Sequence, residues 1–218
     1  MSNAENPVLL KSVTIHESGM KTVEEGKVKL FTGFTPDVAN RYTVAVLFSA
    51  SNQDVSVSDF TKLMTDFEKQ HSLELYVAGR DFPIHTTVGE GVVPSGIALA
   101  DAFGDVSNEE SRSIVFSELV MQNGNILLTT SEATPWFDDF RNRVNASYET
   151  IGFTPLPIEY LVHITLARIK QGSAEDIRAL VETVCAIRED IKKEPIVAKV
   201  NRVFRGPSLS LLNKFPVQ

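Results

Sequence analysis

Two short stretches of this chain carry the same pattern, a histidine followed two residues later by a threonine within a β-rich apolar segment. The first is FPIHTTV, residues 82–88, and the second is YLVHITLARI, residues 160–169. Residues two apart on a β-strand point to the same face. Each stretch therefore predicts a strand with one packed face and one face that presents an imidazole beside a hydroxyl. A fold for this chain has to accommodate both of these half-polar strands.

Helices and strands alternate around the two motifs. Apolar residues recur at helical spacing in three segments, which predicts a helix capped by Ser58 with a Phe60, Leu63, Met64 and Phe67 face, a helix between Thr134 and Gly152, and a helix that begins at Ser173 and is stopped by Pro195. β-Rich runs predict further strands at residues 27–34, 43–49, 73–79, 113–119, 125–131, 196–204 and 207–212. Asn123-Gly124 predicts a hairpin turn.

The order of these elements repeats between the two halves of the chain. Each half of the chain contains a strand region, an amphipathic helix and then a His-x-Thr strand. His85 and His163 lie 78 positions apart, about the length of one small lobe. No short solenoid period is present. This repeated order of elements predicts two similar lobes.

The paired motifs indicate a particular chemistry. Imidazole titrates near neutral pH, so one histidine can take a proton from an attacking hydroxyl or water while the other gives a proton to a leaving oxygen. Hydroxyls of Thr87 and Thr165 can donate hydrogen bonds to non-bridging phosphate oxygens. This chemistry needs neither a metal nor a cofactor. Which histidine is the base and which is the acid stays open.

Other interpretations compete with this one. A buried histidine satisfied by a threonine or a carbonyl would give the same pattern, and either motif alone favours that structural role; the duplication favours a shared site. A metal site built from His85, His163 and Asp81 or Glu90 is disfavoured because it gives the threonines no task.

IHTTV and VHITL resemble the paired His–hydrophobic–Thr/Ser–hydrophobic motifs of the 2H phosphoesterase superfamily, which includes the bacterial 2′-5′ RNA ligases, or RNA 2′,3′-cyclic phosphodiesterases. The resemblance implies an α+β, bilobal fold in which two antiparallel sheets face a central cleft, with helices on the outside and one motif on each sheet. It implies His85 and His163 as the catalytic pair, Thr87 and Thr165 as phosphate ligands, and ring opening to a 2′-phosphate. Arg168 is a candidate substrate-binding residue, although on an ideal strand it faces away from His163 and Thr165.

The first motif departs from the family pattern in two ways. Thr86 stands where an apolar residue is usual, and Gly89-Glu90-Gly91 is expected to end the strand early.

Composition limits the partners. The net charge is −7, which disfavours non-specific binding of nucleic acid. Between Ile196 and Phe215, however, there are no acidic residues, and four cations lie there: Lys199, Arg202, Arg205 and Lys214. The expected partner is an RNA end or a small nucleotide with a cyclic phosphate. The main alternative is a non-catalytic nucleotide or RNA-end binding module, in which Arg202 and Arg205 hold phosphate.

The single cysteine, Cys185, excludes an internal disulfide, and we expect no secretory signal, no membrane span and a cytoplasmic location. Residues 41–218 are expected to form one bilobal domain, preceded by an extension, residues 1–40, of unknown role.

Overall fold

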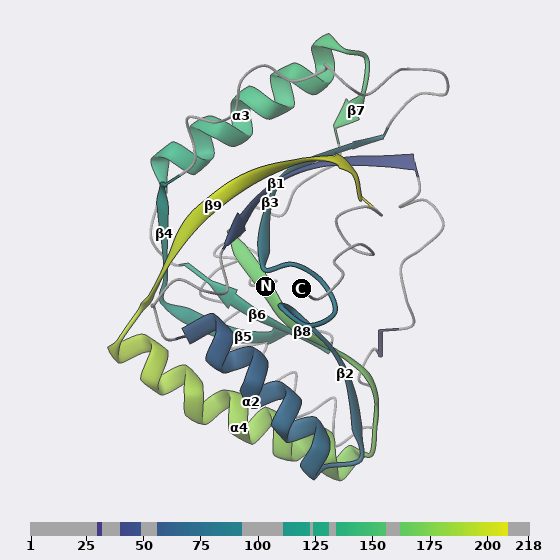
Figure 1. The fold of residues 1–218 in the computed structure, drawn as a ribbon, viewed down its shortest axis with the longest axis vertical. Helices are drawn as coiled ribbons and strands as arrows, with labels where there is room; N and C mark the ends of the chain where they lie inside the picture. Colours follow the sequence, from purple (N-terminus) through teal and green to yellow (C-terminus); the bar gives the residue numbers. More distant parts are fainter. Residues whose placement is uncertain are drawn as a thin grey trace, which may run out of the picture.

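The structure, a computed structural model, describes residues 30–31, 40–48, 56–92, 111–122, 124–130, 134–155 and 162–208. These residues form an α+β fold of two antiparallel sheets and three helices (Figure 1). The two motif strands belong to different sheets.

The five-stranded sheet has the order β4-β9-β1-β3-β7 and carries the first motif. Its strands are β4 (Ser113–Phe116), β9 (Ile196–Pro207), β1 (Arg41–Phe48), β3 (His85–Val92) and β7 (Thr154–Pro155). The nearly continuous apolar sequence of β1 fits its central place, since every residue after Arg41 is buried.

The four-stranded sheet has the order β2-β8-β6-β5 and carries the second motif. Its strands are β2 (Leu73–Val77), β8 (His163–Gly172), β6 (Asn125–Thr129) and β5 (Glu118–Gln122). Strands β5 and β6 form the hairpin expected at residues 123–124, where Gly124 has a φ of 78°. Asn123 lies outside the described residues.

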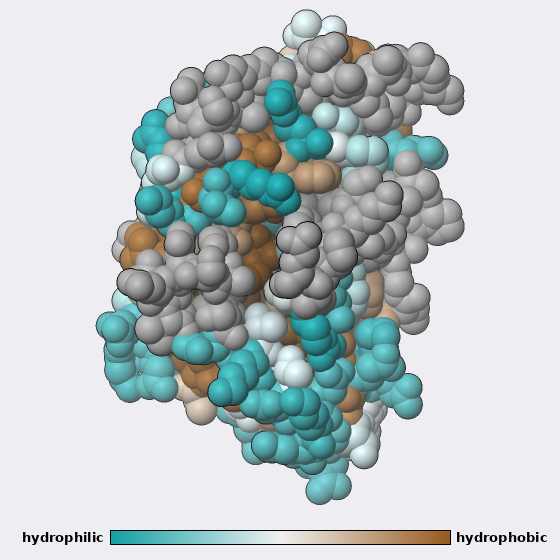
Figure 2. Space-filling view, in the orientation of Figure 1, coloured by the Kyte–Doolittle hydropathy of each residue, from teal (hydrophilic) through white to brown (hydrophobic). Residues whose placement is uncertain are grey.

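The helices lie at the two ends of the molecule. Along its longest axis the order is α3 (Pro135–Thr150), the five-stranded sheet, the four-stranded sheet, and then α2 (Ser56–Gln70) with α4 (Ala174–Lys193) (Figure 1). One hydrophobic core contains residues of both sheets and all three helices. The outer side of α2 and α4 is covered by hydrophilic side chains (Figure 2).

The helix boundaries follow the sequence closely. The Ser173 hydroxyl accepts a hydrogen bond from the backbone N–H of Asp176 at 3.1 Å, so the expected cap of α4 is confirmed. Thr134 precedes α3 as expected, but its side chain makes no capping bond. Helix α2 begins at Ser56, so Ser58 lies within its first turn and the expectation that it caps the helix was wrong.

The apolar faces of the helices are buried with one clear exception. On α2, Phe60, Met64 and Phe67 are buried, but Leu63 is 38% exposed. The expected face of α2 was therefore too wide by one residue.

Several strand expectations were wrong in extent. The expected strand over 113–119 is two strands, β4 and β5, which belong to different sheets. Strand β9 runs unbroken from Ile196 to Pro207, so the strand expected over 196–204 continues into the first residue of the one expected over 207–212; residues 209–212 lie outside the described part. Of the strand expected over 27–34 only Leu30 and Phe31 are described, and the Phe31 N–H donates to the carbonyl of Ile169 in β8 at 2.7 Å.

None of the described helices has an apolar stretch long enough to span a membrane.

Candidate active site

The first motif lies at the start of β3, and its burial alternates as a strand requires. His85 and Thr87 are half-buried, whereas Thr86 and Val88 are buried on the opposite face. His85 lies opposite Leu47 of β1. The expected pairing of an imidazole and a hydroxyl on one face is therefore confirmed for this strand.

A β-bulge follows Thr87. Val44 of β1 pairs with Gly89 and Ala45 pairs with Thr87, so Val88 is an extra residue without a partner on β1. The insertion reverses the alternation of faces. Glu90, the fifth residue after His85, consequently shares the face of His85 and Thr87.

The sequence predicted that Gly89-Glu90-Gly91 would end the strand early, but β3 continues through these residues to Val92. A Cβ at Gly89 would lie 2.8 Å from Val144 Cγ1, and a Cβ at Gly91 would lie 2.9 Å from Tyr148 Cδ1. Gly89 and Gly91 therefore let α3 pack directly on the backbone of β3. The Arg141 Nε of α3 donates to the carbonyl of Val88, the bulged residue, at 3.3 Å.

The second motif, at the start of β8, has the same bulge. Leu127 of β6 pairs with Thr165 and Ile126 pairs with Ala167, so Leu166 is the extra residue. Arg168 consequently shares the face of His163 and Thr165, which corrects the expectation that it would face away. His163 is half-buried and Thr165 is 8% exposed.

The two motif strands meet at their beginnings. The Thr86 hydroxyl donates a hydrogen bond of 2.9 Å to the backbone carbonyl of His163. Thr86 faces away from His85, and its hydroxyl joins the two sheets beside the histidines. A hydrophobic residue at this position would lack that bond.

The His85 ring is oriented by its own strand. Its Nδ1 lies 2.8 Å from the Pro83 carbonyl, which can only accept, so Nδ1 carries the proton and Nε2 presents the lone pair. Burial lowers the pKa of His85, and the positive charges of His163 and Arg168 lower it as well; with the opposing effect of the hydrogen bond to Pro83 included, the pKa is about 4. Although the residue as a whole is only half-buried, protein atoms crowd around its ring. His163 and Arg168 therefore lie close enough to His85 for their charges to interact.

Arg168 is held in a polar and aromatic setting. Its Nη1 donates to Asn125 Oδ1 at 3.0 Å, and its guanidinium lies 5.3 Å from the centre of the Phe31 ring. Burial lowers the pKa of Arg168, an effect that the nearby Tyr76 hydroxyl opposes. A charged group that is largely withdrawn from water interacts strongly with any anion that reaches it.

A row of aromatic rings, which the motif analysis did not anticipate, connects Arg168 to His85. Ring centres are 5.2 Å apart for Phe31 and Tyr76, 4.7 Å for Tyr76 and Phe82, and 6.1 Å for Phe82 and His85. Phe82 stands three residues before His85, and Tyr76 pairs with Arg168 across β2 and β8. Only the strand register, which the sequence does not state, brings them together.

The basic segment expected near the site is divided between two faces of β9. Arg202 pairs with Leu47, which in turn pairs with His85, so Arg202 shares the motif face. Arg205 pairs with Val44 and lies on the opposite face. Lys214 lies outside the described residues.

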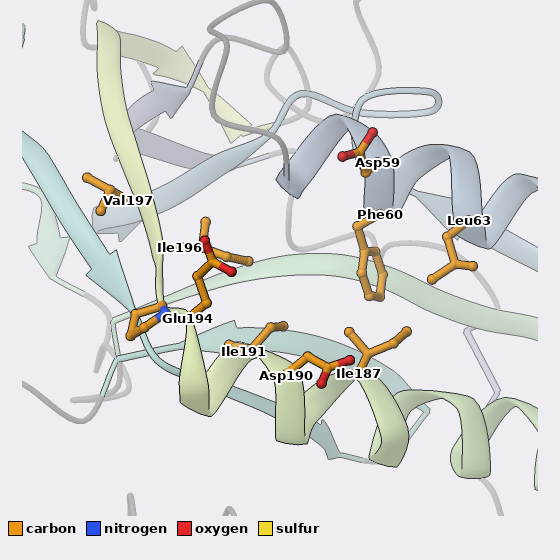
Figure 3. A pocket seen from close by; sticks show the side chains of 10 residues that line it. Asp59, Phe60, Leu63, Ile187, Asp190, Ile191, Glu194, Ile196 and Val197 are labelled. Atoms are coloured by element: carbon orange, nitrogen blue, oxygen red, sulfur yellow. The ribbon is translucent and has the colours of Figure 1, made fainter.

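A separate hollow of about 600 Å³ lies between α2, α4 and the start of β9 (Figure 3). Its wall is mainly apolar and includes Leu63 and Ile187, and its rim carries the carboxylates of Asp59, Asp190 and Glu194. None of these elements carries a motif residue. Carboxylates around an apolar floor would repel a phosphate, so this hollow is not part of the candidate site.

No protein-family model matches the chain, and no curated protein matches its sequence.

Proposed function

We propose that this chain is a metal-independent phosphoesterase that opens 2′,3′-cyclic phosphates of RNA ends or small nucleotides, or acts on 2′-5′ linkages. One observation supports it above the others. Two strands of the same His-x-Thr pattern, each with a bulge after the threonine, begin side by side in different sheets. This arrangement fits the two-lobed 2H phosphoesterase fold, in which each sheet supplies one motif to a common site.

His85 acts as the general base in the hydrolytic direction. Its Nε2 lone pair removes a proton from water while the water oxygen bonds to phosphorus. The bond from phosphorus to the ribose 3′ oxygen breaks, and that oxygen takes a proton from the His163 imidazolium. The product is a 2′-phosphate, and each imidazole ends in the protonation state opposite to the one in which it began.

The anion is held by neutral and charged donors together. Thr87 and Thr165 donate to the non-bridging oxygens, and Arg168 neutralises charge that accumulates as the fifth bond to phosphorus forms. A bound phosphate also favours the protonated form of a nearby imidazole, so it raises the pKa of His85 from its low value towards the working pH.

The low pKa of His85 also favours a second candidate, a nucleotide or RNA-end binding module without turnover. An imidazole that stays neutral can accept a hydrogen bond from a ligand without ever taking the proton. Such a module would use the same face.

The test is turnover of 2′,3′-cyclic nucleotides in the presence of EDTA. We expect hydrolysis to the 2′-phosphate by the wild-type chain and a loss of about 10²–10⁴-fold for His85→Ala and for His163→Ala. His71→Ala, at the end of α2, serves as the control. Binding of nucleotides without product would favour the binding module, and full activity in both motif variants would exclude the proposed catalytic pair.

A further inference from the structure

The motif face of the five-stranded sheet has a regular arrangement on three adjacent strands. Along β3 it presents His85, Thr87 and, because of the bulge, Glu90; along β1 it presents Leu47, Ala45 and Thr43; along β9 it presents Arg202, Phe204 and Gly206. The register aligns them in three rows across the sheet: Arg202–Leu47–His85, Phe204–Ala45–Thr87 and Gly206–Thr43–Glu90. Strands β9, β1 and β3 run side by side (Figure 1).

The third row supplies an acceptor. The Thr43 hydroxyl donates to Glu90 Oε1 at 3.0 Å, and Arg41 Nη1 lies 3.4 Å from Glu90 Oε2. An ionised carboxylate has about four acceptor positions. Both oxygens of Glu90 therefore keep the capacity to accept another bond, and the side chain remains about a quarter exposed.

The second row supplies a stacking surface. Phe204 packs against Ala45 and Leu47, which form a small cluster separate from the main core. Its ring lies over Gly206 of the third row: a Cβ at Gly206 would lie only 2.9 Å from Phe204 Cζ. Phe204 is half-buried, so part of the residue packs against the sheet and part of it remains exposed. Nucleobases stack readily on such rings.

We propose that Phe204 and Glu90 form a nucleobase subsite that selects guanine, an inference that rests on the proposed function of the same face. We place the phosphate at Thr87 and His85. Thr87 pairs with Ala45 and Glu90 pairs with Thr43, so Glu90 lies two residue pairs beyond Thr87 along the sheet, a distance on the order of 7 Å. That separation is comparable to the span of a nucleoside from its ribose phosphate to the far edge of its base.

The chemistry of Glu90 decides which base fits. A carboxylate can only accept hydrogen bonds, so its partner must present donors. Guanine presents two adjacent donors, N1–H and the 2-amino group, which match the two carboxylate oxygens. Adenine and cytosine place an acceptor nitrogen beside their amino group, and uracil flanks its single N–H with carbonyls. A ribose that carries a 2′,3′-cyclic phosphate has no free 2′ or 3′ hydroxyl to compete.

The test measures binding without turnover, by calorimetric titration of the full chain with the 2′-monophosphates of guanosine, inosine and adenosine. We expect guanosine to bind about 10–100-fold more tightly than adenosine. Inosine, which lacks only the 2-amino group, should fall between them. Glu90→Gln should abolish the preference, whereas Glu149→Gln, an exposed position on α3, should keep it. Phe204→Leu should weaken all three ligands together.

The possible outcomes distinguish a failure of the proposed guanine subsite from a failure of the proposed catalytic function. Equal binding of the three ligands, or a guanine preference that survives in Glu90→Gln, would overturn the subsite. The guanine preference in a chain without turnover would support the subsite while the catalytic proposal fails. Turnover of all four 2′,3′-cyclic nucleotides at equal rates, with equal binding, would overturn the subsite while the catalytic proposal stands. Thermal unfolding of each variant checks that the fold is retained.

Discussion

Strands β3 and β8 share one motif and one backbone irregularity, but they differ in the residue that follows. Both begin with His-x-Thr, and both have an extra residue immediately after the threonine. The fifth residue after the histidine then returns to the motif face in each, but it is Glu90 in one strand and Arg168 in the other. The repeated part presents one imidazole and one hydroxyl from each sheet, and the fifth position adds a carboxylate on one strand and a guanidinium on the other.

The two bulges are also stabilised differently. The carbonyl of Val88 accepts from the Arg141 side chain of α3, whereas the carbonyl of Leu166 accepts from the backbone N–H of Ala78 at 2.9 Å. A helix therefore supports one bulge, and the end of a neighbouring strand supports the other. The same local backbone feature can thus arise from unrelated surroundings.

The largest expected effect concerns the cationic side. Arg168→Met should lower kcat/KM on a 2′,3′-cyclic nucleotide about 100-fold, because a desolvated donor to the phosphate is lost. Arg168→Lys should recover only part of this, since an ammonium cannot reproduce the planar fork of donors. Steady-state kinetics provide the measurement, with the exposed Arg178→Met of α4 as the control. A change of less than threefold in Arg168→Met would remove Arg168 from the site.

The next effect tests the packing difference between equivalent positions. Gly89 corresponds to Ala167, the fourth residue after each histidine. Gly89→Ala should lower the free energy of unfolding by about 2 kcal/mol, because the new methyl would meet Val144 and Tyr148. Ala167→Gly should cost about 1 kcal/mol, mainly through backbone entropy. Urea unfolding measures both, and a smaller cost for Gly89→Ala would contradict the close approach of α3.

The third effect follows from the low pKa of His85. The unfolded chain takes up this proton near pH 6.5 and the folded chain only near pH 4, so the unfolded state binds more protons between these values. Stability should therefore fall by about 1–2 kcal/mol as the pH drops from 6.5 to 4, less than the full linkage value because the residue is only half-buried. Unfolding curves at several pH values should show a weaker decline in His85→Gln. Parallel curves for the two proteins would argue against the burial of this imidazole.

The smallest effect separates two neighbouring threonines. Thr86→Val should cost about 1 kcal/mol of stability, because its hydrogen bond to the His163 carbonyl is lost. Thr87→Val should leave the unfolding free energy nearly unchanged and lower kcat/KM instead, as its hydroxyl lies on the motif face. If both variants lose activity and neither loses stability, the assignment of the two hydroxyls to different tasks is wrong.

Local patterns predicted much of the fold. The three helices, the hairpin at residues 123–124 and the two motif strands follow from periodicity, caps and turn residues, which depend on neighbours in sequence. The expected contrast between half-buried His85 and buried Val88 also appears in the structure.

The bulges could not be predicted in this way. A bulge is a relation between a strand and its partner, and its stabilising contacts come from Arg141 and Ala78, which are distant in sequence from Val88 or Leu166. A prediction that assumes an ideal strand without a bulge places Arg168 and Glu90 on the face opposite the histidine of their own strand. The bulges return both residues to the motif face. The exposure of Leu63 has a similar origin, since helical periodicity identifies a face but not whether the neighbouring elements extend far enough to cover it.

The hydrogen bond from Thr86 to the His163 carbonyl also joins the two sheets at one defined point. It lies beside both imidazoles, whereas Glu90 and Arg168 lie several residues farther along their strands. Because this bond ties the two motif strands together at the level of the histidines, it resists a shift of one sheet against the other most where the imidazoles lie and least at the far ends of β3 and β8.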